Sequence, residues 1–230
     1  MFEVESPRPR STRDRPAKSP LSEGVILDTA MRILREEGLD AVTMRRLASE
    51  LDTGPASLYV YIRNRDDLLN AMFDRVGGMV ELEEPDPQRW RDQLHRLVDS
   101  LLTALAQHRG IAQVAVANVP TGENALRVAD TLMGVLLAGG VTPRDAAWAC
   151  DILPLFVTAA AMETDTYQER GDAPDHIVDH LQGVFSTLSP DRYPNLARHA
   201  QDLVSGDGEE RFHFGIDTFL DGLVARAGRS

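Results

Sequence analysis

The 230 residues carry 24 lysines and arginines against 36 aspartates and glutamates, a formal net charge of −12 at pH 7. For the chain as a whole, this balance argues against a nucleic-acid-binding protein, because proteins that neutralise phosphates present a basic surface. Hydrophobic residues at 43% and charged residues at 26% are ordinary globular values and exclude a fibrous or largely disordered chain. The single cysteine, Cys150, excludes an internal disulfide and a paired-cysteine motif, and favours a reducing, cytoplasmic environment.

The first 20 residues are rich in arginine, proline and serine and nearly devoid of apolar side chains, so we expect residues 1–20 to form a disordered basic arm. They lack the apolar core of a secretory signal. The longest apolar run, residues 152–162, falls between Asp151 and Glu163 and is too short for a transmembrane helix. The sequence therefore predicts neither export nor a membrane partner.

From Leu21 onward, apolar residues recur about every 3.6 residues, and alternating β-branched runs are absent, which predicts an all-α fold. The helices expected first are short and span residues 22–37, 44–51, 55–61 and 65–79. Those expected later are mostly longer and span residues 88–107, 111–116, 123–138, 143–170, 174–188 and 211–227. Residues 189–210 are expected to form a loop with one or two helical turns. This change in helix length predicts two domains, residues 21–80 and 81–230.

Residues 43–61 have the layout of a helix-turn-helix. Thr43 suits the N-cap of the first helix, Gly54 falls in the turn, and Pro55 suits the first position of the second helix. The exposed side of that second helix, expected to be two turns long, carries Ser57, Tyr59, Val60 and Tyr61. Such side chains contact base edges and phosphates in a major groove. Arginines flank the pair at positions 45, 46, 63 and 65.

The acidic charge is distributed unevenly along the chain. Residues 1–75 hold 12 basic and 13 acidic side chains, so nearly all of the net charge of −12 lies beyond them. Residues 41–65 carry four arginines against two acidic residues, and residues 6–20 carry five basic residues against one. The overall acidity thus does not exclude DNA binding by the first domain. Two alternatives stay open: the two helices form a plain helical corner, and the arm is only a solvated tail rather than a DNA contact.

The first domain resembles the N-terminal domain of the TetR family of transcriptional repressors. The resemblance covers residues 22–68 and rests on three motifs: Ala30-x-x-Ile33-Leu34-x-x-x-Gly38, Val42-Thr43-x-Arg45-x-Leu47-Ala48, and Ser57-Leu58-Tyr59-x-Tyr61-Ile62-Arg63-Asn64-Arg65. Tyr61 and Arg65 stand where family members commonly carry His and Lys. The resemblance implies that the DNA-facing residues are Arg45, Pro55, Ala56, Ser57, Tyr59, Val60 and Tyr61, with Arg65 holding a phosphate at a helix N-terminus.

The second domain resembles the tetracycline-repressor type of C-terminal domain. The matching stretches are Trp90–Leu101, His108–Thr121 and Phe212–Leu223. Gly215 and Gly222 lie seven residues apart on one helix face and would let another helix approach closely. The resemblance implies a homodimer in which helices 143–170 and 211–227 form a four-helix bundle with the same helices of a second copy. The alternative is that these apolar faces are buried within one subunit.

The same resemblance implies a cavity for a small-molecule inducer in the second domain. Its expected lining is Leu97, Leu101, Asn118, Thr131, Trp148, Asp151, Phe156 and Glu163. The alternative for the apolar members of this set is an ordinary core. Tetracycline-binding relatives hold a magnesium-bound drug with histidines, and these positions fall at Glu81 and Ala115 here, which argues against tetracycline as the ligand.

Two rival functions have weaker support. His176 and His180, with Asp179 between them, faintly resemble a zinc-binding helix, but no third ligand is apparent, and an exposed polar helix face explains them as well. A helical module that binds a protein partner would explain the acidity but not the helix-turn-helix. We therefore expect no enzyme, metal or cofactor. The sequence predicts a cytoplasmic, homodimeric regulator, a repressor that binds a palindromic double-stranded DNA operator and that a small-molecule inducer releases.

Overall fold

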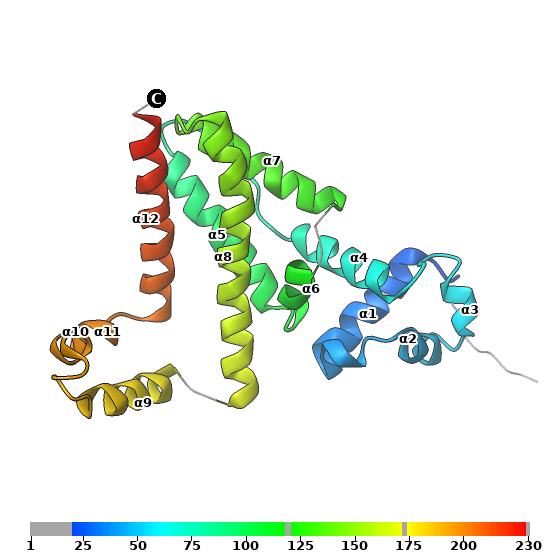
Figure 1. The fold of residues 1–230 in the computed structure, drawn as a ribbon. Coiled ribbons are helices and arrows are strands. Elements are labelled where there is room, and N and C mark those ends of the chain that lie inside the picture. Colours follow the sequence, from blue (N-terminus) through cyan, green and yellow to red (C-terminus); the bar gives the residue numbers. More distant parts are fainter. Residues whose placement is uncertain (1–19, 118–120, 172–173, 229–230) are drawn as a thin grey trace, which may run out of the picture.

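The computed structural model describes residues 20–117, 121–171 and 174–228, and within these ranges the regular structure is entirely helical. This confirms the expected all-α fold. Figure 1 shows an elongated arrangement, with α1–α4 at one end, a central group of longer helices, and α12 at the other end. The expectation for the N-terminal arm concerns residues 1–20, of which 1–19 lie outside the described ranges.

The first domain consists of α1 (Glu23–Glu37), the 3₁₀ turn η1 (Leu39–Ala41), α2 (Met44–Glu50), α3 (Pro55–Leu58) and α4 (Arg65–Gly77). Each of the three main helices begins at a side chain that accepts a backbone N–H. Ser22 accepts from Val25 at 3.3 Å, Thr43 from Arg46 at 3.1 Å, and Asn64 from Asp67 at 2.8 Å. These caps explain why the helices start where they do, since the first N–H groups of a helix lack intrahelical acceptors.

The second domain is built around α5 (Trp90–Ala106), α6 (Ile111–Ala117), α7 (Glu123–Ala138) and α8 (Pro143–Arg170), which pack on one another. The chain then forms α9 (Pro174–Ser186), α10 (Pro194–Arg198) and α11 (Ala200–Leu203), which contact each other away from the central helices. The last helix, α12 (Gly208–Ala227), returns alongside α8 (Figure 1). Two of the expected long helices, 123–138 and 143–170, have the predicted bounds.

Two details differ from the sequence-based expectations. Helix α3 is a single turn rather than two, because the chain turns at Tyr59 and the N–H groups of Tyr61 and Ile62 both reach the carbonyl of Leu58. Gly54 falls in the turn as expected, and the left-handed residue of that turn is Asp52, with φ 49°, since aspartate tolerates this conformation. Helix α12 begins three residues before the expected start, because Asp207 and Glu210 form a capping box.

The two domains share one continuous hydrophobic core. Helix α4 packs against α5, α6 and α7, so the last helix of the first domain is also part of the second. By length and composition alone, α8 would also suit a membrane span, a property that core helices of globular domains share. Here one side of α8 is buried against α5–α7, as in a core helix.

Candidate DNA-binding surface and ligand domain

Helix α3 and the turn after it present an exposed strip at the end of the molecule farthest from α12 (Figure 1). Leu58 and Ile62 are buried and anchor this segment against α2. Between them, Tyr59, Val60 and Tyr61 point outward, Val60 with 78% of its surface exposed. Pro55 and Ala56 are also exposed, and Ser57 is half-buried. The predicted DNA-facing residues of α3 and of the turn after it therefore lie together on one exposed segment.

The four flanking arginines differ in their contacts, and three of them lie before or just after the exposed strip. Arg45 is exposed, and Arg63 is almost fully exposed with an ion pair to Asp67 at 2.8 Å. Arg46 instead turns back to Glu37 at 2.6 Å and Glu50 at 2.5 Å, and these hydrogen bonds raise the pKa of its guanidinium. Arg46 thus links α2 to α1 and contributes little free charge to the strip.

Arg65 has a bracing role within the first domain. Its Nε donates to the carbonyl of Val42 at 2.9 Å, and its Nη2 donates to the carbonyl of Leu39 at 3.3 Å. Arg65 is the first residue of α4, so these bonds tie the start of that helix to η1. The sequence pattern did not reveal these contacts, because the bonded residues lie more than 20 positions away.

The predicted ligand-lining residues do not converge on one cavity within a single subunit. Leu97 is buried on α5, and Leu101 and Thr131 are half-buried on α5 and α7. Four residues of α8, however, are exposed on its outer side: Trp148, Asp151, Phe156 and Glu163. Within one subunit these four side chains do not face α5–α7, because α8 turns a different face toward those helices, and their assignment to a ligand site stays a prediction. Asn118 lies outside the described residues.

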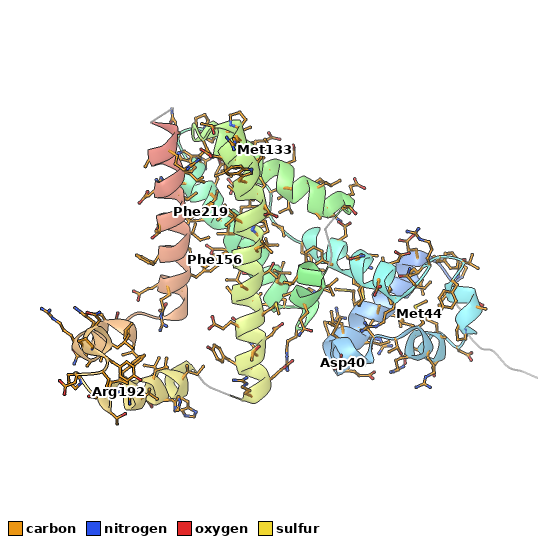
Figure 2. All side chains as sticks on the ribbon, in the orientation of Figure 1. Asp40, Met44, Met133, Phe156, Arg192 and Phe219 are labelled. Carbon is orange, nitrogen blue, oxygen red and sulfur yellow. The ribbon has the colours of Figure 1, made fainter. Side chains whose placement is uncertain are left out.

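Phe156 is the partly exposed residue that lies toward α12. Figure 2 places Phe156 and Phe219 between α8 and α12. The Phe156 ring stacks on Phe212 of α12 with centroids 5.4 Å apart. A Cβ atom added to Gly215 would lie 2.7 Å from Cζ of Phe156, so glycine permits this close approach. Gly222 has open space around its Cα, and the expectation of a partner helix there stays a prediction.

Two shallow grooves open on the surface of the described chain. One, of about 480 Å³, lies where the end of α1 and η1 meet Arg109, Gly110 and Glu169. The other, of about 500 Å³, runs between residues 82–85 and α7 and includes Thr131. Within the described ranges, no group of three or more His, Cys, Asp or Glu side chains has the geometry of a metal site, and His176, Asp179 and His180 are exposed.

Sequence reasoning missed a polar seam between α5 and α12. His95 and His213 contact each other through their Nδ1 atoms at 2.9 Å. The Nε2 of His95 lies 2.9 Å from Asp217, and the Nε2 of His213 lies 3.1 Å from Asp99. No local pattern could reveal this cluster, because more than 100 residues separate its two halves along the chain.

Sequence reasoning also missed the buried carboxyl group of Asp165 on α8. Its Oδ2 accepts the N–H of Gly110 at 2.8 Å. The available signal was an acidic residue on the largely apolar side of a long helix, a position where charge is unfavourable unless it is paired.

Comparisons with known proteins match this geometry. Residues 26–72 match the model of the bacterial regulatory proteins of the tetR family, and residues 84–227 match that of the tetracyclin repressor-like C-terminal domain. The chain belongs to the TetR family. It is therefore a ligand-responsive, DNA-binding transcriptional regulator.

Similar TetR-family proteins include ActR from Streptomyces coelicolor. The structure of ActR in complex with actinorhodin is 40% identical, covers 91% of this chain and 100% of that chain, and superposes with a TM-score of 0.83. The repressor DrrR1 of Streptomyces coeruleorubidus is 28% identical over 94% of this chain and 78% of its own length. The class G tetracycline repressor of Vibrio anguillarum is 27% identical over 88% and 93% of the two chains.

Proposed function

We propose that this regulator is a homodimeric, cytoplasmic repressor that binds a palindromic operator and leaves it when a small molecule binds the second domain. The exposed strip around Tyr59 is the observation that carries the proposal. A two-fold dimer would place two such strips in successive major grooves about one helical turn apart. A single turn of reading helix supplies few base contacts, so specific affinity needs both copies.

The residues assigned to DNA divide by the kind of contact that each supports. Tyr59 and Tyr61 offer a ring face and a hydroxyl, and Val60 offers an apolar surface that suits a thymine methyl group. Arg45 and Arg63 are the exposed charges beside them and suit phosphates. Arg65 remains among the proposed phosphate contacts mainly because it is the first residue of α4, where the helix dipole also favours an anion.

The dimer proposal rests on the outer sides of α8 and α12. These helices expose much of several large apolar side chains: Trp148, Ile152, Leu155, Phe214 and Val224, together with the part of Phe156 that does not stack on Phe212. A contiguous apolar surface of this kind marks an interface in a globular protein. If two copies packed through this same surface about a two-fold axis, the open face at Gly222 would also be buried. The α8 residues that the sequence places in a cavity lining, Trp148 and Phe156 among them, would then lie at the subunit interface.

A ligand lowers operator affinity only by binding the DNA-free state more tightly than the DNA-bound state. Leu97, Leu101 and Thr131 remain the candidate ligand contacts contributed by α5 and α7. Actinorhodin is the first compound to test, because the similar protein ActR is known in complex with it.

The decisive experiment is a mobility-shift titration with the DNA upstream of the regulator's own gene, with an unrelated fragment of equal length as control. Specific retardation that actinorhodin reverses would support repressor and inducer together. Specific retardation that actinorhodin leaves unchanged would support operator binding and exclude only actinorhodin as the inducer. Equal affinity for both fragments at every salt concentration would refute operator recognition and leave a protein-binding helical module as the better account.

A further inference from the structure

Asp165 is a buried acidic residue with an incomplete set of partners. It lies near the C-terminal end of α8, with 4% of its surface exposed. Its Oδ2 accepts the backbone N–H of Gly110, whereas its Oδ1 is buried and has no hydrogen-bond partner in the described chain. Burial raises the pKa of this carboxyl group. Such a group costs stability relative to an apolar side chain, so a stabilising role does not explain its position.

The bonded partner belongs to the tight turn between α5 and α6. Gly110 has φ 83°, a left-handed conformation that glycine adopts without strain. A second tie joins the same turn to α8, since Arg109 pairs with Glu169 at 3.3 Å. The buried bond from Asp165 is the stronger constraint, because the Arg109 pair is exposed and screened by water.

The turn lies directly against the first domain. A Cβ atom at Gly110 would sit 3.1 Å from the Cβ of Leu39, so the turn and η1 are in close contact. The carbonyl of Leu39 accepts a hydrogen bond from Arg65, the first residue of α4. Only Asn64 separates Arg65 from the exposed loop that follows the reading helix and ends at Arg63. Continuous contacts thus run from α8 through the turn and η1 to the DNA-binding surface.

We propose that Asp165 is a positioning residue for DNA binding, which fixes the α5–α6 turn on α8 and thereby sets where η1 and the reading helix stand relative to that helix. This inference rests on the proposed function, in which α8 forms the dimer face. The orientation of each reading helix on its own α8 then sets the spacing of the two helices in the dimer. A shift at this contact would change operator affinity without any change in the DNA-facing residues.

Four variants separate positioning from stability. Asp165→Leu removes the acceptor for the N–H of Gly110, and Asp165→Asn retains an oxygen acceptor at nearly the same size. Gly110→Ala pushes a methyl group against Leu39 and leaves Asp165 intact. Leu153→Ala is the matched stability control, because it opens a cavity on the buried side of α8 about three turns from Asp165.

Two measurements are made on each full-length variant. The first is operator affinity at a temperature well below every Tm. The second needs neither DNA nor ligand: pulsed electron paramagnetic resonance between spin labels at Arg63→Cys and Arg127→Cys, both exposed, in a Cys150→Ser background diluted with unlabelled protein. This distance joins the DNA-binding end of a chain to α7 in its second domain.

We expect Asp165→Leu and Gly110→Ala to weaken operator binding about tenfold and to shift or broaden the label distance. Asp165→Asn should restore both, and Leu153→Ala should lower Tm with little change in either. In a variant that combines Asp165→Leu with Gly110→Ala, the fold-loss of operator affinity should be smaller than the product of the two single fold-losses, because both substitutions act on one contact.

An unchanged label distance in Asp165→Leu would overturn the inference, as would losses of affinity that simply follow Tm across all four variants. If Asp165→Leu does not fold, the same distance measured in Gly110→Ala decides the question. Failure of the unmodified protein to bind any operator would refute the proposed function, while the label distances would still test the role of Asp165.

Discussion

Two surfaces of this molecule expose aromatic and apolar side chains, and they differ in what surrounds them. At the DNA-binding end, Tyr59, Val60 and Tyr61 form a narrow strip with exposed arginines beside it. Along α8 and α12, larger side chains such as Trp148 and Phe214 form a broader surface. Exposure alone therefore does not say what a surface binds. Size and neighbouring charge distinguish a surface suited to DNA from one suited to a second copy.

Charge separates the two surfaces further. On the α12 side, Asp221 pairs with Arg91 of α5 at 2.6 Å and Asp217 lies 2.9 Å from His95 of α5, so both carboxylates at the border of the apolar surface have partners within the subunit. At the other end, Arg45 has no ion pair in the described chain. A surface with an unpaired cation attracts phosphates, whereas an apolar surface whose bordering carboxylates already have partners favours a protein interface.

The largest expected effect comes from placing charge on the α8 surface. Leu155→Glu should convert the dimer to a monomer, because a carboxylate would be buried at the interface without a partner. With one reading helix left, operator affinity should fall by about a thousandfold or more toward non-specific binding. Light scattering after size exclusion gives the mass, and mobility shifts give the affinity.

Leu126→Glu on α7 is the matched control, since Leu155 is 52% and Leu126 57% exposed. Both substitutions should leave the fold of a subunit intact, so only the position of the charge differs. A dimer that survives Leu155→Glu, or one that Leu126→Glu disrupts equally, would show that α8 does not form the interface.

The next largest effect concerns the DNA-binding strip. Tyr59→Ala should weaken operator binding about a hundredfold, because a lost base contact of about 1 to 3 kcal/mol is counted in both subunits. The dimer mass and Tm should hardly change, since the side chain is half exposed. Tyr193→Ala, which removes a tyrosine of similar exposure near α10, should leave affinity unaltered. Full affinity in Tyr59→Ala would refute the assignment of the reading helix.

The first domain was largely predictable from its sequence because its determinants are local. The caps at Ser22 and Thr43 and the left-handed Gly38 set helix ends within a few residues. The length of α3 was not predictable, because it depends on how Ile62 anchors the following turn. The different roles of Arg45 and Arg46 likewise depend on where α1 places Glu37.

The ligand domain was less predictable because helical periodicity identifies an apolar face but not the element that covers it. Trp148 and Phe156 have the spacing of a core, yet the structure leaves both exposed on one subunit. Residue types also failed to mark Asp165, whose partner is the backbone of a residue 55 positions away. Contacts of this range follow from the packing of α6 on α8 and not from any local pattern.

A smaller effect tests the division among the arginines. Arg45→Gln should reduce the dependence of the logarithm of affinity on the logarithm of salt concentration by about two units per dimer, because each lost phosphate contact contributes about 0.9. Arg46→Gln should leave this slope nearly unchanged and lower Tm slightly, since Arg46 pairs with Glu37 and Glu50. An equal salt dependence of affinity in the two variants would contradict the assignment of Arg45 to a phosphate contact and of Arg46 to ion pairs within the domain.

The smallest effect compares two buried carboxyl groups at opposite ends of α8. Burial raises the pKa of Asp165 in the folded state, so folding disfavours its ionised form. As pH rises from the ordinary aspartate value of about 4 through the raised pKa, the native protein loses stability relative to the unfolded chain. Asp165→Asn has no such proton to lose. Its Tm relative to the unmodified protein should therefore rise with pH over this window and then level off.

Asp145, near the start of α8, should show the opposite dependence. A hydrogen bond from Arg226 at 3.1 Å lowers the pKa of Asp145, so its ionised form stabilises the fold above the ordinary pKa and this stabilisation disappears as pH falls. Asp145→Asn should thus be less stable than the unmodified protein at neutral pH and approach it in acid. Thermal unfolding followed by circular dichroism from about pH 2 to 8 covers both windows, since the one for Asp145 lies below the ordinary aspartate value and the one for Asp165 above it. If the difference in Tm from the unmodified protein varied with pH in the same way for both variants, the opposite pKa shifts would be contradicted. Burial disfavours the ionised form of Asp165, whereas Arg226 stabilises the ionised form of Asp145.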